Sequence, residues 1–368
     1  MLFRSPRLSD AEFFYTQDKK KPLQDYLSQL KHIVYHNKLG TQSERSERVK
    51  TIASLIVKNL NQTKLLDAVL LASDLSKADL STHMVGEFPE LQGVMGRYYA
   101  LNEKISEEVA FAIEDHYKPR FSGDTLPRSS VGDIVSIADK IETLIGLFSI
   151  GEKPTGDKDP FALRRQVIGI IRILTEKNIG LNLNTTISDS IKATNLAESK
   201  DLNTFIYDRI SNFFKDQGYG ALDIEAVLSI DSGLICEIPK RLNAIREFSA
   251  LPESKDLASA NKRVGNILKK ADLKTTLKVD PTLLKDIAEI NLYKTLDLVD
   301  ADARKEYLAN NYSGSLKLLC KLKNPIDQFF NDVMVNVENE SLKMNRLALL
   351  EKLYSAMNLV ADLSKLSS

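Results

Sequence analysis

The sequence predicts an all-α fold, and three observations support that prediction. Apolar residues recur three or four positions apart in one segment after another; in residues 133–148 they include Ile134, Ile137, Ile141 and Leu144. No stretch alternates apolar and polar residues for long enough to predict a sheet. Proline and glycine stand between the periodic segments, where helices are expected to end.

Length and charge limit the kind of protein this sequence encodes. A chain of 368 residues has room for about two domains. Its 50 basic and 50 acidic residues give no net charge, so any contact with nucleic acid must come from a local patch. Cys236 and Cys320 are too few for a disulfide scaffold, which fits a reducing cytosol. Since no apolar stretch reaches about 18 residues, no membrane span is predicted.

The first half reads as a series of helices. Residues 10–39 form charged amphipathic segments, and residues 45–80 form a helix pair. Pro89 breaks the following segment, and helical periodicity resumes over residues 91–100. His116 follows two carboxylates and is a weak candidate for an acid or base, because no nucleophile is spaced to use it.

A polar loop over residues 151–160 leads into a further helix, with Asp159 predicted as its N-cap and Pro160 as its first residue. In this helix Arg164 shares a side with apolar residues, whereas Arg165 faces another side. An unpaired buried charge is costly, so Arg164 is expected to pair with Asp139 or Asp157.

A segment rich in Asn, Ser and Thr follows, over residues 178–190, and predicts a domain boundary near residue 180. Apolar periodicity then returns and continues to the end of the chain. The segments predicted to be helical are 203–230, 234–251, 261–278, 283–299, 315–335 and 340–366.

Residues 261–278 form the clearest basic element. Six Lys and Arg residues against Asp272 give six minus one, or a net charge of plus five. On a helix, one half carries Lys262, Arg263, Asn266, Lys269 and Lys270. The other half carries Val264, Ile267, Leu268 and Ala271. A solvated face is the plainer interpretation, but one-sided charge of a single sign suits a phosphate backbone better. The six basic residues are Lys262, Arg263, Lys269, Lys270, Lys274 and Lys278.

Six runs of residues carry a resemblance to a known family. Ser76–Leu80, Glu87–Gly93 and Asp159–Arg165 strongly resemble runs in the beta subunit of the tetrameric bacterial glycyl-tRNA synthetase. Ala260–Leu268 is similar to the tail region of that subunit. Phe329–Val335, followed by residues 345–350, is similar to the helical anticodon-binding domain that the beta subunit shares with arginyl-tRNA synthetases. The resemblance covers nearly the whole chain.

The resemblance implies an HD-like helical domain over residues 1–180, then a helical linker and an anticodon-binding domain over residues 181–368. In that family the alpha subunit carries the glycine and ATP chemistry, with Mg, and the beta subunit holds tRNA(Gly) in an alpha2-beta2 assembly. This chain is therefore expected to bind no cofactor and to be inactive alone. A large region precedes this point in the family, so the sequence is expected to be a piece of a longer chain.

The HD-like domain is expected to lack a metal. In metal-dependent HD hydrolases a first His, a His-Asp pair and a last Asp bind the metal. Here Arg45 falls near the first position, Lys77 and Ala78 near the second, and only the last Asp is kept, as Asp139. A cation at a ligand position opposes the charge of the metal. His32 and His36, spaced one helical turn apart, are expected to be a partly exposed pair rather than ligands.

The sequence thus predicts no catalytic residue, since it contains no P-loop pattern, no metal cluster and no nucleophile with a base. Two alternatives remain: a degenerate HD phosphohydrolase, and a scaffold that docks a catalytic subunit without binding RNA. The predicted tRNA-binding residues are Lys262, Arg263, Asn266, Lys269, Lys270 and, on weaker grounds, Arg346. The predicted structural or recognition residues are Lys77, Asp79, Asp139, Asp159, Arg164 and Arg165.

Overall fold

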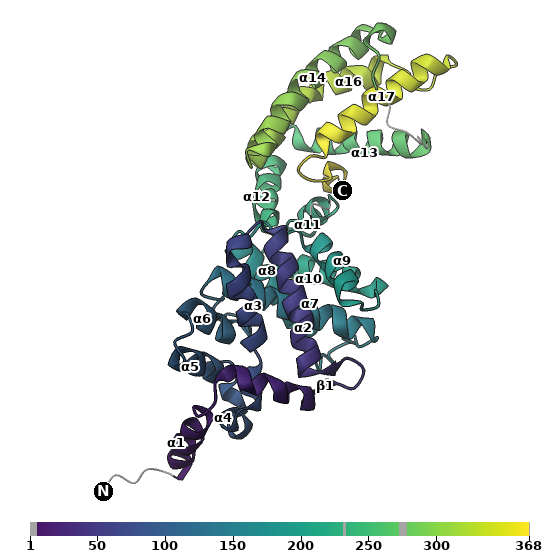
Figure 1. Cartoon of the computed structure of the whole chain (residues 1–368). Coiled ribbons are helices and arrows are strands. Elements are labelled where there is room, and N and C mark those ends of the chain that lie inside the picture. Colours follow the sequence, from purple (N-terminus) through teal and green to yellow (C-terminus); the bar gives the residue numbers. More distant parts are fainter. Residues whose placement is uncertain (1–5, 231–232, 272–277, 368) are drawn as a thin grey trace. The chain divides into compact units, whose positions relative to one another are not determined.

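Helices make up most of the chain, as a computed structural model shows over residues 6–230, 233–271 and 278–367 (Figure 1). Within these ranges there are 17 α-helices and one small hairpin of strands β1 (Val34–His36) and β2 (Gly40–Thr41). The predicted all-α class is confirmed. In the same ranges, no helix combines the length and the apolar character needed to cross a bilayer.

The chain divides into two units. The first is Met1–Ile210 with Gly233–Cys236, and the second is Ser211–Ser232 with Glu237–Ser368. The boundary expected near residue 180 lies inside the first unit, because helix α9 (Leu183–Thr194) packs against helix α2 (Gln42–Asn59). The Asn59 side chain donates a hydrogen bond of 3.3 Å to Thr186 across this contact.

Helix α7 (Ser130–Ser149) forms the centre of the first unit. It packs against α2, α3, α6 and α8, and every residue from 131 to 148 is buried. The apolar residues predicted to be buried in this helix are buried, and Asp139 and Lys140 are buried as well, because α7 has helices packed on several sides. Lys140 is buried with its ammonium donating to the Lys118 carbonyl at 2.9 Å and to the Ser136 hydroxyl at 2.8 Å.

Polar side chains fix where the helices around α7 begin. Thr41 and Glu44 form a capping box at the start of α2, and Ser129 accepts a hydrogen bond from Gly132 at the start of α7. The other elements of the first unit are α1 (Pro6–Asp18), η1 (Leu23–His32), η2 (Thr63–Leu65), α3 (Leu66–Leu75), η3 (Ala78–Ser81), α4 (His83–Glu87), η4 (Pro89–Leu91), α5 (Val94–Asn102), α6 (Glu107–Asp115) and α8 (Leu163–Glu176). Helix α10 (Lys200–Asp216) extends from the first unit into the second.

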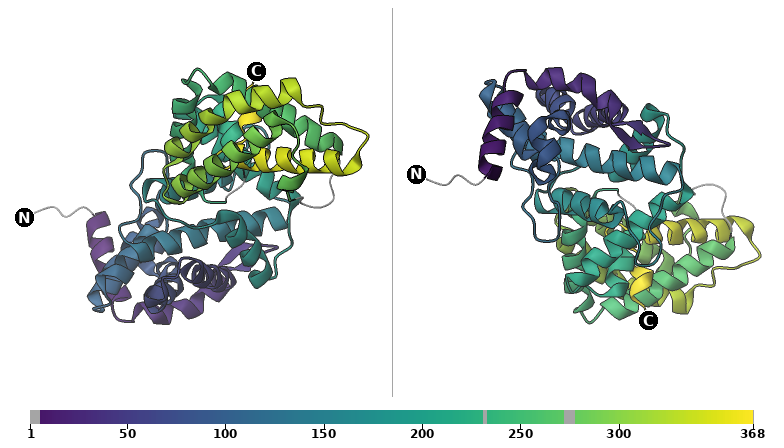
Figure 2. Two further views of the ribbon diagram at one scale, coloured as in Figure 1. Left: turned by 90° about the horizontal axis from the view of Figure 1, so that it is seen from above. Right: turned by 90° about the horizontal axis from the view of Figure 1, so that it is seen from below.

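The second unit is a helical bundle around buried leucines and Phe329. Helix α14 (Ile287–Leu308) packs against α15 (Tyr312–Leu319), α16 (Lys323–Asp332) and α17 (Glu340–Met357). Helix α13 (Ser254–Ala271) packs against α17 and η8 (Leu363–Leu366). Figure 2 shows these green and yellow helices gathered together in both of its views. The remaining elements are α11 (Ala221–Leu228), η5 (Ile235–Glu237), α12 (Ile238–Ser249), η6 (Pro281–Leu283) and η7 (Cys320–Leu322).

Helix α8 begins later than the sequence predicted. Pro160 and Phe161 form a turn, Ala162 takes a left-handed conformation with φ of 55°, and the helix begins at Leu163. Asp159 still satisfies the first turn, because its carboxylate accepts from the Leu163 N–H at 2.8 Å and from the Arg164 N–H at 3.0 Å. Asp159 therefore anchors the helix from the preceding loop.

The expected burial of Arg164 against a carboxylate is also wrong. Arg164 is half-buried and its guanidinium donates to the Gly156 carbonyl, whereas Asp139 lies elsewhere with other partners. The helix begins after the turn, so its buried side consists of Leu163, Val167 and Ile171 with their neighbours rather than the side of Arg164. Arg165 is exposed, as the sequence predicted.

We expect Asp159→Ala to lower the free energy of unfolding by about 0.5–2 kcal/mol, because two first-turn N–H groups lose their acceptor. Arg165→Ala should change it by less than about 0.5 kcal/mol, since that side chain is exposed. Urea unfolding of the two variants measures both values, and similar losses would contradict the anchoring role of Asp159.

Candidate nucleic-acid interface

Helix α13 of the second unit presents its basic residues to solvent. On its inner side Leu257, Asn261 and Val264 are buried, and the Asn261 amide donates to Asn358 at 2.8 Å. The outer side has five exposed residues, here called the basic face: Lys262, Arg263, Asn266, Lys269 and Lys270. The predicted division of this helix is therefore confirmed over its described residues. Of the other basic residues counted in this element, Lys278 is exposed and Lys274 lies outside the described residues.

The charges of the basic face are not neutralised within the described parts of the chain. Across residues 6–230, 233–271 and 278–367, Lys262, Lys269 and Lys270 have no ion-pair partner. The acidic residue of the first turn, Asp256, pairs instead with Lys323 of α16 at 2.7 Å. Four cations of one sign on a solvent-facing helix side provide the positive potential that a polyanion requires.

Arg346, the sixth predicted tRNA contact, has a different role. It is 7% exposed and donates to Asp286 at 2.7 Å, to the Met334 carbonyl at 2.6 Å and to Glu289. These bonds join α17 to the first turn of α14, and they leave Arg346 no nitrogen directed at a ligand on the surface. The structure thus corrects the sequence-based assignment, because the guanidinium is used to neutralise a buried carboxylate.

The positions compared with the metal ligands of HD hydrolases meet in the first unit. The Asp139 carboxylate lies 3.0 Å from the Arg45 guanidinium and 3.3 Å from the Lys77 ammonium. His116 joins them, with Nε2 at 2.7 Å from the Lys77 ammonium and Nδ1 at 2.6 Å from the Ile113 carbonyl. We call these four buried side chains the HD-like centre.

Electrostatics explain how these four groups share a buried space. Burial alone would raise the pKa of Asp139, but the charges of Arg45 and Lys77 hold that pKa below its usual value. Burial lowers the pKa of Lys77 to about 8 and the pKa of His116 well below its usual value, the latter also through the Lys77 charge. His116 is therefore a neutral imidazole that donates from Nδ1 and accepts at Nε2.

This arrangement opposes metal binding. Among the described residues, no three His, Cys, Asp or Glu side chains are grouped as ligands. Both cations beside Asp139 would repel a divalent ion, and His116 already accepts at Nε2 from Lys77. The absence of a bound metal stays a prediction, and these contacts are its physical basis.

Asp79 joins two of the runs that carry the family resemblance. Its buried carboxylate accepts from the Gly93 N–H at 2.5 Å and from the Gly96 N–H at 3.0 Å. Gly93 has φ of 80°, which favours glycine, and a Cβ on Gly96 would lie 2.6 Å from Ile113. Burial raises the pKa of Asp79 to about 6. This contact supports the structural interpretation of both runs.

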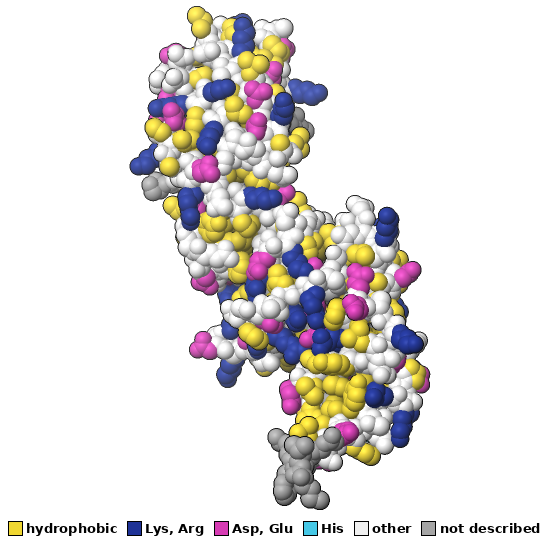
Figure 3. All heavy atoms as spheres, turned by 90° about the vertical axis from the view of Figure 1, so that its left-hand side faces the viewer, with side chains coloured by type: hydrophobic (Ala, Val, Ile, Leu, Met, Phe, Trp, Pro, Cys, Tyr) yellow, Lys and Arg dark blue, Asp and Glu magenta, His cyan; other side chains and the backbone are white. Residues whose placement is uncertain are grey.

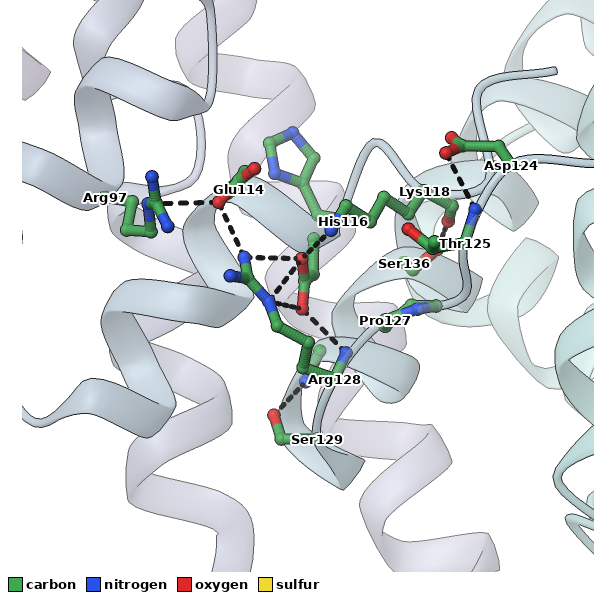
Figure 4. Close-up of polar contacts among 12 residues, drawn as sticks. Arg97, Glu114, His116, Lys118, Asp124, Thr125, Pro127, Arg128, Ser129 and Ser136 are labelled. Atoms are coloured by element: carbon green, nitrogen blue, oxygen red, sulfur yellow. Dashed lines mark hydrogen bonds and ion pairs between the residues drawn. The ribbon is translucent and has the colours of Figure 1, made fainter.

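Sequence reasoning missed a neighbouring ion-pair network, shown in Figure 4. Arg128 binds both oxygens of Asp115, at 2.8 and 2.9 Å, and reaches Glu114 at 2.6 Å. Arg97 approaches Glu114 from α5 at 3.0 Å. The partners come from separate elements, so no local spacing indicates them. Figure 3, which faces the side where α5 and α6 lie in Figure 1, shows basic side chains beside hydrophobic ones on this surface.

The histidine pair does not share a helix. His32 ends η1, and His36 lies in β1, where its ring is 6.0 Å from that of Phe161. The helical spacing assumed from the sequence is wrong because the chain turns into a strand after Ile33. His32 is exposed and His36 is half-buried, as the prediction of a partly exposed pair required.

Comparison with known proteins agrees with the helical fold. Residues 257–363 match the family model of the DALR anticodon binding domain, which includes the whole basic face, so the chain is of the class that carries a helical anticodon-binding domain. Residues 4–229 match the model of the glycyl-tRNA synthetase beta subunit. The chain therefore belongs to the glycyl-tRNA synthetase beta subunit family, and the predicted resemblance is confirmed.

Three relatives show what share of the length of a family member this chain covers. It is 53% identical over 368 residues to the glycine–tRNA ligase beta subunit of Methylobacillus flagellatus, covering 99% of this chain and 52% of the relative. The beta subunits of Dechloromonas aromatica and Delftia acidovorans are 52% and 50% identical, with the same coverage of both chains. The chain thus spans about half the length of these relatives.

We expect Arg346→Ala to destabilise the fold by about 3–5 kcal/mol, because it leaves Glu289, which is 1% exposed, without its cation. Lys269→Ala, on the exposed side of α13, should change stability by less than about 0.5 kcal/mol. Denaturant unfolding measures both. A mild effect of Arg346→Ala would show that the Glu289 carboxylate finds other partners.

His116 should make stability sensitive to acid. Its folded pKa is lowered, so below about pH 6.5 the unfolded chain binds a proton that the folded chain does not. Asp79 has the opposite effect, because its folded pKa of about 6 favours proton binding in the folded state.

Asp79 is present in both the unchanged chain and His116→Gln. Its contribution therefore cancels when the free energies of unfolding of the two chains are subtracted. The free energy of unfolding of the unchanged chain, minus that of His116→Gln, should fall below pH 6.5, with a slope approaching about 1.4 kcal/mol per pH unit. Urea titrations from pH 8 to pH 5 give this difference. A difference that does not depend on pH would mean that burial does not lower the pKa of His116.

Proposed function

We propose that this chain is the tRNA-binding portion of a glycyl-tRNA synthetase beta subunit. It would support the ATP-dependent ligation of glycine to tRNA(Gly) that an alpha subunit catalyses, in an alpha2-beta2 assembly in the cytoplasm. The observation that carries the proposal is the basic face of α13, whose lysines have no ion-pair partner in the described residues and lie within the match to an anticodon-binding domain.

The physical basis is release of counterions from RNA. Each phosphate that a lysine neutralises frees condensed cations into solution, so affinity falls steeply as salt rises. Lys262, Lys269 and Lys270 are exposed and, within the part of the chain that the structure describes, have no carboxylate partner to displace before they reach a phosphate. Their contribution to RNA binding is therefore not offset by the loss of an internal ion pair.

The first unit supports this role as a scaffold. His116 is fully buried, and Asp139 is held by two cations, so neither side chain meets a substrate in this arrangement. The chemistry of ligation would then belong to the alpha subunit, which would bind ATP and Mg. These contacts also oppose the alternative of a degenerate HD phosphohydrolase, since the centre has no exposed group to activate water.

We expect the triple variant Lys262→Ala, Lys269→Ala, Lys270→Ala to bind tRNA(Gly) more weakly at low salt than the unchanged chain. Each lost phosphate contact should reduce the slope of log affinity against log salt by up to about one unit. The loss should be similar for many tRNAs, because phosphates carry no sequence information. Filter binding across a salt series measures both the affinity and the slope.

The control replaces Lys19, Lys20 and Lys21 by alanine. These are three exposed lysines of the first unit, of which Lys19 lies over the Tyr15 ring and Lys20 binds Gln17. The control should keep the affinity and slope of the unchanged chain. An equal loss in both triple variants, or no loss in either, would show that α13 has only a solvated face. A chain that binds an alpha subunit but no tRNA at any salt would support the scaffold alternative.

A further inference from the structure

A shallow hollow of about 370 Å³ lies along the exposed side of α13. Its six lining residues all belong to this helix: Ser259, Lys262, Arg263, Asn266, Ile267 and Lys270. Among the residues that the structure describes, no acidic side chain lines it. Ser259 and Lys270 stand at its two ends, while Lys262, Arg263, Asn266 and the half-buried Ile267 lie between them. A site that bound only phosphates would need only cations. The amide of Asn266 and the apolar side chain of Ile267 therefore require a ligand with other chemical groups.

Arg263 is held in place before any ligand binds. The centre of its guanidinium lies 4.0 Å from the centroid of the Phe330 ring. Phe330 is half-buried on α16 and packs edge-on against Phe329, which is fully buried, with the ring centroids 5.5 Å apart. The guanidinium therefore rests on an aromatic support that is anchored in the core. A planar group fixed in this way forms a surface on which a flat base can stack.

Asn266 lies one helical turn from both Lys262 and Arg263 and is exposed. Its amide has two donors and an acceptor, and within the described residues it makes no hydrogen bond. Ile267 supplies apolar contact beside it. Proteins that recognise RNA loops use this combination: bases unstack, lie against aromatic rings or guanidinium planes, and pair through their edges.

We propose that this hollow receives one unstacked base of the anticodon loop, with Asn266 reading the edge of the base and Arg263, supported by Phe330, stacking on its face. The inference rests on the proposed function and goes beyond it by assigning base recognition to Asn266, Arg263 and Phe330. Lys262 and Lys270 then bind the phosphates on either side. Affinity and discrimination are thus divided between different residues of one helix.

The test uses the full chain and glycine tRNA transcripts in which each anticodon-loop base is replaced by another base or by an abasic site. The unchanged chain should bind at least one abasic transcript about tenfold more weakly, because a stacked base is lost. Asn266→Ala should reduce discrimination at that loop position about tenfold and leave the salt slope unchanged. Phe330→Leu should weaken binding of the complete transcript but not of the abasic one.

Asn324→Ala is the matched control, since Asn324 is an exposed asparagine on α16 outside the hollow. It should bind every transcript like the unchanged chain. Melting curves identify any loss of folding in Phe330→Leu, and Asn266→Ala, on an exposed position, provides an independent answer.

The possible failures are distinguishable. If Asn266→Ala keeps the discrimination of the unchanged chain, the base-recognition proposal is overturned, and a weakened lysine triple variant would still support tRNA binding. If the unchanged chain binds every abasic transcript as tightly as the complete one, no base enters the hollow. If the unchanged chain binds no tRNA, the proposed function fails, and this inference fails with it.

Discussion

The carboxylate of Asp139 lies in a helix that is buried on every side, and this placement constrains the whole first unit. An ionised carboxylate in that position requires cations and hydrogen-bond donors close by. Arg45 from α2 and Lys77, which directly precedes η3, supply the two cations. Arg45 also binds Glu142 one turn along α7, at 2.8 Å. The ion pairs thus fix α2 and the segment before η3 against the central helix, and a metal is not needed to hold them there.

The cations of helix α13 differ from the cations at the centre of the first unit. In the first unit the central cations are buried: Lys77, which is 3% exposed, pairs with Asp139. Lys140 binds carbonyl and hydroxyl oxygens, and burial lowers its pKa to about 7. In the second unit Arg346 is buried and paired, but the cations of α13 remain at the surface. Since the whole chain has no net charge, the attraction to RNA that we propose depends on this separation.

Features that depend on the local pattern of apolar and polar residues were predicted correctly from the sequence. Periodicity gave the helical class and the two sides of α13, because a helix that packs on one side must place its polar residues on the other. It failed where tertiary contacts decide. Arg164 and Arg346 both lie near apolar neighbours, yet one is half-buried with a carbonyl acceptor and the other is buried between two carboxylates. Elements that are distant in the sequence decide which of these two surroundings each arginine has.

The start of helix α8 is another feature that the local sequence pattern predicted incorrectly. Asp followed by Pro is typical of a helix start, but Asp159 satisfies the first turn from a loop that ends in a left-handed Ala162. Asp79 also bonds backbone N–H groups, in its case those of Gly93 and Gly96. The most distinctive runs in the sequence are thus built around carboxylates that hold the backbone. They identify the fold, whereas the proposed contacts with RNA come from ordinary exposed lysines, whose chemistry is common on protein surfaces. For this reason the family is easier to identify from the sequence than the residues that we propose to contact RNA.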